Sequence, residues 1–385
     1  MKYVVLGAGM MGRAVAYDLA TYQASDDIVL ADINLEAATS AARSIGERVH
    51  PVRLNVDNDA ALAGVLEGAS AVVSAVSYAV NVRVTEAAIR AGAHMCDLGG
   101  NNDVVDRQLA LDGEARRRDV AIIPNCGLAP GLINILGMSG ASLFQQLDSI
   151  RLRVGGLPQH PRPPLMYEIV FSVEGLINEY IEPSEVIRDA RRLRVRSMED
   201  LEEIEFPPPF GRMEAFTTSG GLALMARSLE RKVRELDYKT IRYPGHCEKF
   251  RTLLELGFAS SEPLTIGSGL TTARELFTEL LRRKLQGTDT DLVLARATVT
   301  GQLDGRRRRL EYEFIDYYDA KARMTSMART TAFPTAIIAA MLVRGEITTR
   351  GVASAEQCVD GEAMIRELAR RGIQITRRLT DAEAE

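Results

Sequence analysis

Gly7-Ala8-Gly9-Met10-Met11-Gly12 follows an apolar run, Tyr3–Leu6, and opens a helical pattern. In that context a G-x-G-x-x-G segment is typical of a dinucleotide-binding turn. Gly7 allows the tight turn, Gly9 lets a pyrophosphate approach the backbone, and Gly12 lets the helix pack closely on the strand. The helix N-terminus then offers free N–H groups and its positive dipole end to the phosphates. These six residues predict a Rossmann fold.

An acidic residue stands where this fold uses one to choose its cofactor. Asp32 ends the second apolar run, 20 residues after Gly12. A carboxylate in that place hydrogen-bonds the ribose hydroxyls and repels a 2′-phosphate. Ile33 and Asn34 follow it, and neither is an arginine. The sequence therefore favours NAD over NADP, and the alternative is a Rossmann fold that has lost its nucleotide.

The loops after the third and fourth strands are expected to contact the same cofactor, because parallel strands place their carboxyl ends at one edge of the sheet. The small residues after the fourth strand suit close approach of a ligand, although an ordinary strand-to-helix turn has the same composition. Besides the glycines and Asp32, the expected cofactor contacts are Met10, Met11, Asp57, Ala75, Val76 and Ser77.

The first 125 residues alternate short apolar runs with amphipathic stretches, which predicts a parallel α/β sheet. The expected strands are Tyr3–Leu6, Ile28–Ala31, Val49–Leu54, Ala71–Ser74, His94–Asp97 and Ala121–Ile123. The expected helices are Met11–Tyr22, Glu36–Ile45, Asp59–Leu66, Val80–Ala91 and Val104–Arg118. Asp57 or Asn58 is the expected N-cap of the third helix. Six strands with crossover helices make a doubly wound sheet.

The pattern changes after Pro124. Ser149–Val154 alternates apolar and charged residues, and Leu292–Thr300 and Leu310–Tyr317 flank Asp304-Gly305, a hairpin turn signal. The predicted fold class is thus α/β, with a Rossmann doubly wound parallel sheet in residues 1–125. A second α+β domain of mostly antiparallel sheet, which is also the candidate dimerisation domain, is expected in residues 126–325. Apolar helical patterns lead us to expect that residues 326–385 return to the Rossmann domain.

Bulk composition excludes several function classes. The net charge of −5 does not suit a nucleic-acid or anionic-membrane surface, which needs a basic excess. No stretch reaches the roughly 18 uninterrupted apolar residues of a membrane helix, and the N-terminus lacks a signal-peptide pattern. Four cysteines without C-x-x-C spacing are expected to be reduced thiols, namely Cys96, Cys126, Cys247 and Cys358. We therefore expect a cytoplasmic protein.

Five further motifs lie in order along the chain. They are Cys96-Asp97-Leu98-Gly99-Gly100, Gly127-Leu128-Ala129-Pro130-Gly131-Leu132-Ile133-Asn134, Glu214-Ala215-Phe216-Thr217-Thr218-Ser219-Gly220-Gly221, Tyr238-Lys239-Thr240-Ile241-Arg242-Tyr243-Pro244-Gly245-His246, and Arg344-Gly345 with Thr349-Arg350-Gly351-Val352. With the glycine loop they resemble the saccharopine dehydrogenase-like family, and most closely its lysine 6-dehydrogenase branch. The resemblance runs over nearly the whole chain.

The resemblance implies NAD-dependent oxidation of the terminal amine of L-lysine. The products would be 2-aminoadipate 6-semialdehyde, which cyclises to a piperideine carboxylate, with ammonia and NADH. The saccharopine reductases of the family carry an aspartate before the Pro-Gly of the second motif, where this chain has Ala129. That departure favours the lysine branch.

Amine oxidation needs a group that removes a proton from the substrate ammonium before hydride leaves its carbon. Asp97 ends the fifth expected strand and precedes Gly99-Gly100, so it is a candidate general base or, equally, the anchor of that glycine turn. Tyr78 is a candidate for orienting the amine, or it packs against the cofactor. His246 is a candidate proton shuttle near neutral pH, with a hydrogen-bonded structural histidine as the alternative.

An amino-acid substrate also carries a carboxylate, whose natural bidentate partner is arginine. Arg242 is the candidate, because the resemblance places its segment near the substrate; a surface salt bridge is the alternative. Glu214, Thr217 and Ser219 are candidates for binding the α-amino end. No His/Cys/Asp/Glu cluster has metal-ligand spacing, so no metal is expected.

The leading interpretation is an NAD-dependent lysine 6-dehydrogenase that acts on a small amino acid, forms a homodimer and has neither nucleic-acid nor membrane partners. A saccharopine-type or other amino-acid dehydrogenase of the same family is the first alternative, and it would need a second buried arginine for a second carboxylate. A non-catalytic NAD-binding regulator is the other alternative. It would keep the glycines and Asp32 without a protonatable group beside the nicotinamide.

Overall fold

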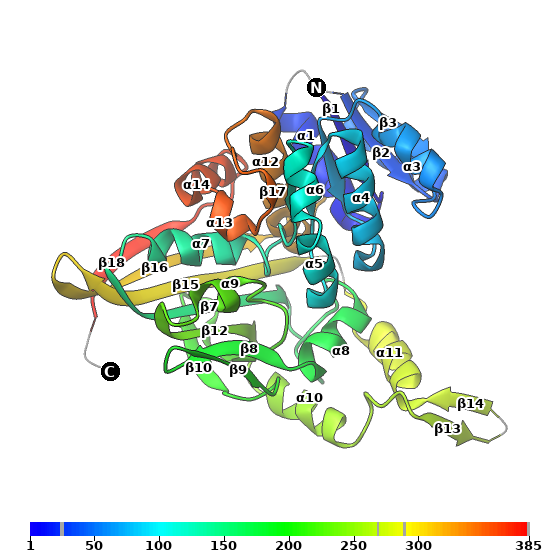
Figure 1. The fold of residues 1–385 in the computed structure, drawn as a ribbon. Coiled ribbons are helices and arrows are strands. Elements are labelled where there is room, and N and C mark those ends of the chain that lie inside the picture. The colour runs from blue at the N-terminus through cyan, green and yellow to red at the C-terminus, as the bar shows by residue number, and fades with distance from the viewer. Residues whose placement is uncertain (24–26, 268, 288–289, 383–385) are drawn as a thin grey trace. The chain divides into compact units, whose positions relative to one another are not determined.

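The computed structural model describes residues 1–23, 27–267, 269–287 and 290–382, and the chain divides into two compact units (Figure 1). Unit 1 comprises Met1–Ser139 and Ala328–Gln374, and unit 2 comprises Gly140–Met327 and Ile375–Glu385. These bounds differ from the expected ones in three places, of which the smallest is that unit 2 extends to Met327 and not to residue 325. Residues 126–139 belong to unit 1, and the chain from Ile375 onward lies with unit 2.

Unit 1 contains a seven-stranded parallel sheet and the helices that connect its strands. Its first elements are β1 (Lys2–Leu6), α1 (Met10–Tyr22), β2 (Asp27–Asp32), α2 (Leu35–Ile45), β3 (Val49–Arg53), α3 (Asp59–Leu66), β4 (Ala71–Ser74) and η1 (Tyr78–Val80). These are followed by α4 (Asn81–Ala91), β5 (His94–Asp97), α5 (Asn102–Leu109), α6 (Asp112–Arg117), β6 (Ala121–Ile123) and α7 (Leu132–Ala141). The C-terminal elements are α12 (Ser326–Val343), β17 (Gly351–Val352), α13 (Ala355–Cys358) and α14 (Gly361–Arg370).

The strand order is β3-β2-β1-β4-β5-β6-β17, which is the doubly wound arrangement with one added strand. The order reverses between β1 and β4, and in such sheets ligands bind at the carboxyl ends of the strands on either side of that point. Val4, Val72, Met95 and Ile122 bring four of the strands into one buried apolar core. The Rossmann prediction is confirmed.

The structure differs from the predicted elements in two local details. The helix expected over Val104–Arg118 is split into α5 and α6, because the chain turns at Ala110 and Leu111. The seventh strand comes from the C-terminal part of the chain, where Val352 pairs with Ile122 of β6. Asn58, one of two predicted N-caps of α3, accepts a hydrogen bond from the backbone of Ala61 at 3.0 Å.

Helix α12 is long and apolar enough to cross a membrane by length and composition, and 83% of that segment is buried inside the chain. A core helix meets the same two criteria, so this is weak evidence for a membrane span. Thr335 in this helix donates a hydrogen bond to the carbonyl of Cys126 at 2.8 Å, which joins α12 to the loop after β6. Both observations fit a core helix of unit 1.

An ion pair with both side chains 0% exposed joins α1 to the end of α14, where Arg371 Nη2 donates to Asp18 Oδ1 at 2.9 Å. Arg371→Leu is expected to lower the free energy of unfolding by about 3–5 kcal/mol, because it leaves Asp18 buried without a counter-ion. The double variant Asp18→Leu with Arg371→Leu is expected to recover most of that loss, since well-packed apolar residues replace buried ion pairs at little cost. Urea denaturation measures both values, and equal losses in the two variants would contradict the argument.

The loss in Arg371→Leu should also depend on pH. Burial raises the pKa of Asp18 to about 6 even with Arg371 beside it, and loss of Arg371 raises that pKa further. A folded-state pKa above the unfolded-state value means that the free energy of unfolding falls as pH rises through the interval between them. The single variant is therefore expected to be closer to wild type at about pH 5 than at about pH 8.

Unit 2 is built on a nine-stranded mixed sheet. Its elements up to β12 are β7 (Gln146–Pro158), α8 (Val173–Ile181), β8 (Ser184–Arg188), β9 (Arg191–Val195), β10 (Glu202–Phe206), β11 (Gly211–Thr217), α9 (Met225–Leu229) and β12 (Val233–Arg242). The others are α10 (His246–Glu255), β13 (Pro263–Ile266), β14 (Gly269–Thr272), α11 (Ala273–Lys284), β15 (Asp291–Leu303), β16 (Arg306–Tyr317) and β18 (Thr376–Asp381).

The main path of this sheet is β10-β11-β12-β7-β15-β16-β18, in which only the β12–β7 pair is parallel. The predicted hairpin is confirmed, since Leu303 pairs with Arg306 across Asp304-Gly305. Both turn residues have positive φ, 52° and 73°, as a two-residue hairpin turn that follows the twist of its strands requires. The expected mostly antiparallel second sheet is thus present.

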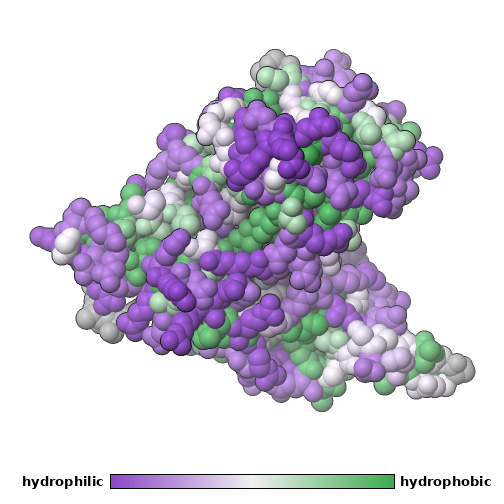
Figure 2. Space-filling view, in the orientation of Figure 1, coloured by the Kyte–Doolittle hydropathy of each residue, from purple (hydrophilic) through white to green (hydrophobic). Residues whose placement is uncertain are grey.

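Helices α8, α10 and α11 of unit 2 share an aromatic core that includes Tyr180, Phe250 and Phe277. Figure 2 shows a largely hydrophilic face with apolar side chains at the end of the β13–β14 hairpin, where Leu264, Ile266 and Leu270 are exposed. The aromatic core matters for function because α8 and α10 bring their polar side chains to the end of β12.

Candidate functional site

The glycine loop of unit 1, Gly7–Gly12, packs closely against the start of the loop that follows β4. A Cβ on Gly7, whose φ is +99°, would lie 2.6 Å from the carbonyl oxygen of Ala75, and one on Gly12 would lie 1.8 Å from that of Gly7. A Cβ on Gly9 would meet nothing within 4 Å. The structure therefore requires Gly7 and Gly12 for packing and leaves open space only above Gly9.

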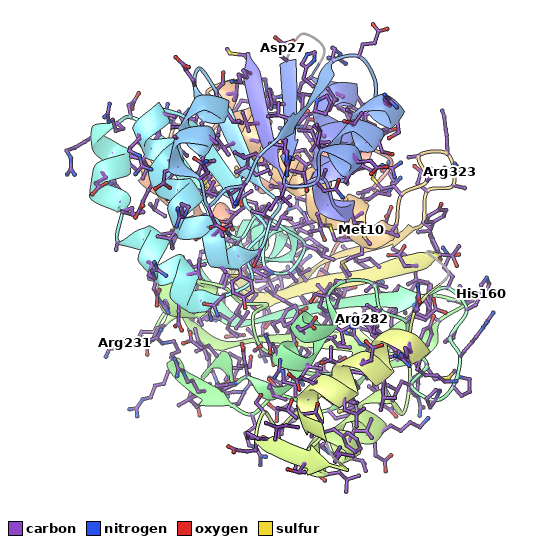
Figure 3. The ribbon with its side chains drawn as sticks, turned by 90° about the vertical axis from the view of Figure 1, so that its right-hand side faces the viewer. Met10, Asp27, His160, Arg231, Arg282 and Arg323 are labelled. Atoms are coloured by element: carbon purple, nitrogen blue, oxygen red, sulfur yellow. The ribbon has the colours of Figure 1, made fainter. Side chains whose placement is uncertain are left out.

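That open space lies at the N-terminus of α1. Gly9 is the N-cap of this 13-residue helix, no side chain caps it, and no acidic residue stands in its first turn. Met10 is exposed and projects from the start of the helix (Figure 3), and Met11 is partly exposed. An uncapped helix N-terminus with room above it fits a nucleotide pyrophosphate.

Asp32 lies at the end of β2 against the same loop. Its Oδ2 accepts a hydrogen bond from Ala8 N at 2.7 Å, and its Oδ1 accepts one from Asn34 N at 2.8 Å. Each carboxylate oxygen keeps a further lone pair for a ribose hydroxyl. Since Ile33 and Asn34 are exposed beside it, no basic side chain at these positions is present to receive a 2′-phosphate.

The remaining expected cofactor residues line the same edge of the sheet. Ala75 and Val76 are partly exposed after β4, and exposed Ser77 accepts a hydrogen bond from Ala79 N at 3.4 Å. Asp57 is exposed, accepts a hydrogen bond on its carbonyl from Arg83 at 3.1 Å, and contributes to an open cavity of about 800 Å³ beside α3 and α4. Asp57 therefore lies beyond β3, the outermost strand on that side of the sheet.

Asp97 is 1% exposed, and both of its oxygens are used. Oδ1 accepts hydrogen bonds from Gly99 N at 2.8 Å and Asn125 N at 3.1 Å, and Oδ2 accepts one from Gln108 Nε2 at 2.7 Å. Burial raises the pKa of Asp97 despite these bonds. Of the two roles that the sequence left open, this geometry favours the anchor of the glycine turn over the general base.

Asp97→Asn is accordingly expected to keep the turnover number within about 10-fold of wild type, because an amide oxygen can still accept from Gly99 and Asn125. Asp97→Ala is expected to cost about 2–4 kcal/mol of stability, since it leaves buried donors without an acceptor. Steady-state kinetics and urea denaturation measure the two effects. If a stable Asp97→Asn enzyme instead shows a turnover number lower by roughly 10²–10⁴-fold, Asp97 is the general base.

Tyr78 begins the short helix η1 and is 38% exposed. A Cβ on Gly100 would lie 2.8 Å from Tyr78 Cδ1, so the ring lies directly against that glycine. Its expected role in orienting an amine stays a prediction.

Arg242 ends β12 in unit 2 and is 2% exposed. Its Nε donates to the hydroxyl of Tyr180 at 2.9 Å, its Nη1 donates to the carbonyl of Ile241 at 2.9 Å, and its Cζ lies 4.6 Å from the ring centroid of Tyr167. Two of its five N–H groups are thus used. Within the described part of the chain, no carboxylate forms an ion pair with it, so Arg242 is a buried cation that is not directly paired.

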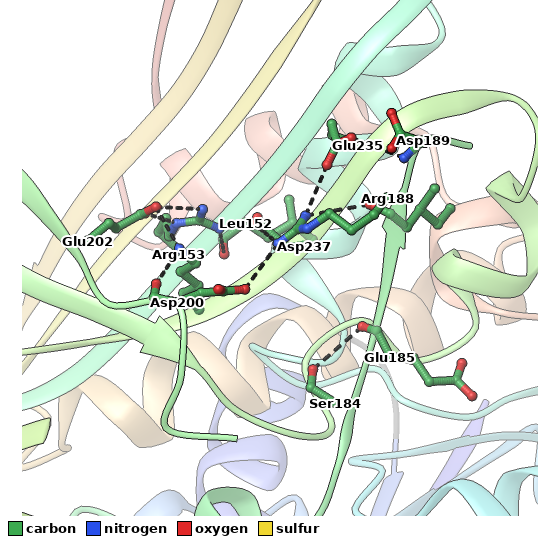
Figure 4. A network of polar contacts seen from close by, with 12 residues as sticks. Leu152, Arg153, Ser184, Glu185, Arg188, Asp189, Asp200, Glu202, Glu235 and Asp237 are labelled. Atoms are coloured by element: carbon green, nitrogen blue, oxygen red, sulfur yellow. Dashed lines mark hydrogen bonds and ion pairs between the residues drawn. The ribbon is translucent and has the colours of Figure 1, made fainter. Parts of the chain in front are cut away.

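A second buried arginine in the same sheet has the opposite environment. Arg153 on β7 is 3% exposed, and its Nη1 lies 2.7 Å from Asp237 Oδ1 while its Nε pairs with Glu202 (Figure 4). Lys239 extends the network, with its Nζ 2.8 Å from Glu202 Oε2. Because this unit neutralises Arg153 completely, the lack of a partner for Arg242 is a specific feature of its site.

His246 lies beside Arg242 in a directed chain of hydrogen bonds. Its Nδ1 is 2.9 Å from the carbonyl of Leu165, so Nδ1 must be the donor, and Nε2 then accepts from the hydroxyl of Tyr180 at 3.1 Å. Burial, with help from Arg242, lowers the pKa of His246 to about 3. Of the two roles that the sequence left open, this environment favours the structural histidine over the proton shuttle. The structural alternative fits, because both nitrogens are engaged and the ring is neutral.

All three residues expected at the α-amino end make contacts within unit 2, Glu214 with its side chain and the other two with their backbone. Glu214 Oε2 accepts from Gly245 N at 2.9 Å and Oε1 accepts from Cys247 N at 2.6 Å, so its carboxylate caps the N-terminus of α10. Thr217 is fully buried, and its backbone N–H donates to the carbonyl of Glu199 at 3.0 Å. Ser219 donates its backbone N–H to the carbonyl of Glu179 at 3.0 Å.

Sequence reasoning missed Tyr167, Glu179 and Tyr180, which surround Arg242. Tyr180 precedes Arg242 by 62 residues, and no spacing or motif links them. Only the packing of α8 on the end of β12 brings them together. Among the described residues, no group of three His, Cys, Asp or Glu side chains is placed to hold a metal ion.

Comparisons with known proteins match both units. A family model described as the saccharopine dehydrogenase NADP binding domain matches residues 3–123, and one described as the saccharopine dehydrogenase C-terminal domain matches residues 127–373. Their order along the chain is the order of the resembling motifs.

Two curated proteins are similar at low identity. The chain is 22% identical over 267 residues to a saccharopine dehydrogenase (NADP(+), L-glutamate-forming) of Pyricularia oryzae, with 67% of this chain and 58% of that protein covered. It is 21% identical over 423 residues to the mitochondrial alpha-aminoadipic semialdehyde synthase of Mus musculus, with 91% and 45% covered. The chain thus spans about half the length of these curated relatives.

Solved structures share the fold. Apo saccharopine dehydrogenase (L-Glu forming) of Saccharomyces cerevisiae superposes with a TM-score of 0.82 at 17% identity, covering 98% of this chain and 99% of that one. Homospermidine synthase of Legionella pneumophila, in complex with NAD, superposes with a TM-score of 0.69 at 11% identity, covering 99% and 92%. At these identities the likeness concerns the fold.

Proposed function

Because the chain belongs to the saccharopine dehydrogenase family, we propose that it is a pyridine-nucleotide-dependent amino-acid dehydrogenase that oxidises the terminal amine of L-lysine with NAD. The terminal ammonium first loses a proton, the carbon of the resulting amine then transfers a hydride to NAD, water adds to the iminium carbon, and ammonia leaves. The balance is one lysine, one NAD and one water consumed for one semialdehyde, one ammonium, one NADH and one proton formed. The semialdehyde then cyclises onto its own α-amino group.

The observation that carries this proposal is the buried guanidinium of Arg242, which forms no ion pair with a carboxylate of the described residues. A buried charge is costly unless it is paired, so a site that keeps one unpaired is suited to an anionic ligand. The unused N–H groups of Arg242 can donate to a substrate carboxylate. A free amino acid supplies that group.

Unit 1 supports the cofactor half of the proposal. The open space above Gly9 and the uncapped N-terminus of α1 suit a pyrophosphate. Asp32, held by Ala8 and Asn34, suits ribose hydroxyls. The matching family model is described as NADP-binding, and the choice of NAD rests on Asp32 and on the lack of a neighbouring arginine.

Wild-type protein is therefore expected to bind NAD at least about 10-fold more tightly than NADP, because the Asp32 carboxylate repels a 2′-phosphate. Asp32→Ala combined with Ile33→Arg is expected to reverse that preference. Calorimetric titration with each nucleotide measures it, with Asp27→Ala at the opposite end of β2 as a matched control. Equal wild-type affinities for the two nucleotides would refute the assignment.

The second candidate is a saccharopine-type or other amino-acid dehydrogenase, which the names of the curated relatives favour. Saccharopine carries a second amino-acid moiety, so its binding calls for another unpaired buried arginine. Arg153 and Arg371 are buried but already paired with carboxylates. The lysine reading needs only Arg242, and a non-catalytic NAD-binding regulator needs no substrate arginine at all.

The deciding experiment is a substrate panel. NADH formation, followed by its near-ultraviolet absorbance, should be fastest with L-lysine among L-lysine, L-ornithine, saccharopine and cadaverine. Faster turnover of saccharopine would select the second candidate, and no turnover of any amine at saturating nucleotide would favour the regulator. The cytoplasmic location and the homodimer stay predictions.

A further inference from the structure

Glu179 lies next to the Arg242 site on an element that takes part in it. It is the third residue from the end of α8 (Val173–Ile181). The next residue, Tyr180, accepts a hydrogen bond on its hydroxyl from Arg242 Nε at 2.9 Å. The carbonyl of Glu179 accepts from Ser219 N at 3.0 Å, so its backbone is tied to the loop after β11. The position of this residue beside Arg242 is therefore set by two neighbouring elements.

The carboxylate of Glu179 has no ion pair and no hydrogen bond within the described part of the chain, and the residue is only partly exposed. It feels the charge of Arg242 without forming an ion pair with it. The other ionisable groups around it are Glu182 after α8, Tyr167 before it, Tyr180 on it and Tyr238 on β12. Two groups of opposite charge in unit 2 thus lie close enough to affect each other's pKa, yet they form no ion pair.

Holding them apart is costly, because each charge loses water without gaining the other as a partner. The same unit pairs its buried charges directly elsewhere, as Arg153 and Asp237 do at 2.7 Å. A ligand that carries a carboxylate and an ammonium group on one carbon would give each of these two side chains a partner of opposite charge. The α-carbon end of a free amino acid is such a ligand.

We propose that Glu179 binds the α-ammonium group of the substrate while Arg242 binds its α-carboxylate, so that unit 2 selects free α-amino acids. The inference rests on the proposed function for the identity of lysine as the substrate. It replaces Glu214, whose carboxylate is occupied at the N-terminus of α10.

The test compares L-lysine with 6-aminohexanoate, which is lysine without its α-ammonium group, by calorimetric titration in the presence of NAD. Wild type is expected to bind lysine more tightly by roughly 10- to 100-fold, the worth of a charge-assisted hydrogen bond in a buried site. Glu179→Gln is expected to lose that preference, because its affinity for lysine falls while its affinity for 6-aminohexanoate stays the same. Glu174→Gln is the matched control, because Glu174 lies exposed on the same helix and pairs with Arg282.

A pH series gives a readout that a structural role would not change. Burial raises the pKa of Glu179 to about 7, and the protonated acid cannot pair with an ammonium ion. Lysine affinity of wild type should therefore weaken as pH falls through about 7, whereas that of Glu179→Gln should stay flat. Glu179→Asp, which keeps the charge, should keep both the preference and the pH response, and it serves if Glu179→Gln fails to fold.

Two results would overturn the inference. One is an unchanged preference for lysine over 6-aminohexanoate in folded Glu179→Gln. The other is a fall in turnover by roughly 10²–10⁴-fold at unchanged lysine affinity, which would make Glu179 a general base instead. Failure of the proposed function is separable, because titration needs no turnover. If lysine is not oxidised, the same preference is tested by comparing ornithine with 5-aminopentanoate and glutamate with glutarate. If the protein binds neither lysine nor ornithine nor glutamate, the inference is overturned.

Discussion

Arg242→Met is expected to raise the KM for L-lysine by about 30- to 5,000-fold, which corresponds to the roughly 2–5 kcal/mol lost when one partner of a buried charge pair is truncated. The affinity for NAD should not change, because the nucleotide residues lie in unit 1 and Arg242 lies in unit 2. Methionine fills a similar volume, so packing against Tyr167 and Tyr180 is largely kept. Steady-state kinetics with lysine and calorimetric titration with NAD measure the two quantities.

The same substitution should leave the protein as stable as wild type or more stable. Removal of Arg242 breaks no ion pair of the described residues, since Glu179 feels its charge without pairing with it, and it relieves an unpaired buried cation. Arg153→Met is the matched contrast, because it takes a partner from buried Asp237 and from Glu202 and should cost about 3 kcal/mol. An unchanged KM in Arg242→Met, or a stability loss equal to that of Arg153→Met, would make Arg242 a structural residue.

Gly9→Val is expected to weaken NAD binding by about 100-fold or more without unfolding unit 1. The backbone of Gly9 has φ −69° and ψ −171°, which any residue adopts, and its Cβ would meet nothing within 4 Å. The valine side chain would instead occupy the space in which the pyrophosphate approaches the helix N-terminus. Calorimetric titration with NAD and thermal unfolding measure the two effects.

Two other glycines sharpen this experiment. Gly12→Ala should reduce both stability and NAD binding, because its Cβ would lie 1.8 Å from the carbonyl oxygen of Gly7. Gly64→Ala, on the exposed side of α3 with no atom within 4 Å of its Cβ, should change neither by much. If folded Gly9→Val protein binds NAD with an affinity close to that of wild type, the nucleotide does not bind at this loop.

The cofactor half of the protein could be predicted from the sequence because its determinants are local. The turn Gly7–Gly12, the strand before it and Asp32 lie within one short stretch, and each acts through backbone conformation or position at a strand end. The β15–β16 hairpin was predictable for the same reason, since Asp304-Gly305 sets its own turn. By contrast, β17 and β18 are short strands that pair only because distant parts of the chain offer them an edge.

For the catalytic and substrate-binding candidates of both units, the sequence alone selected residue types, and the tertiary structure decided which of them are occupied. Arg242, His246, Glu214 and Asp97 were all candidates by chemistry, yet three of them are occupied by neighbours that no spacing reveals. Whether a charged side chain is available depends on which donors and acceptors packing brings within hydrogen-bond distance of it. In unit 2 that property belongs to the assembled core of α8, α10 and the end of β12, where Arg242 and Glu179 form no ion pair with any described residue.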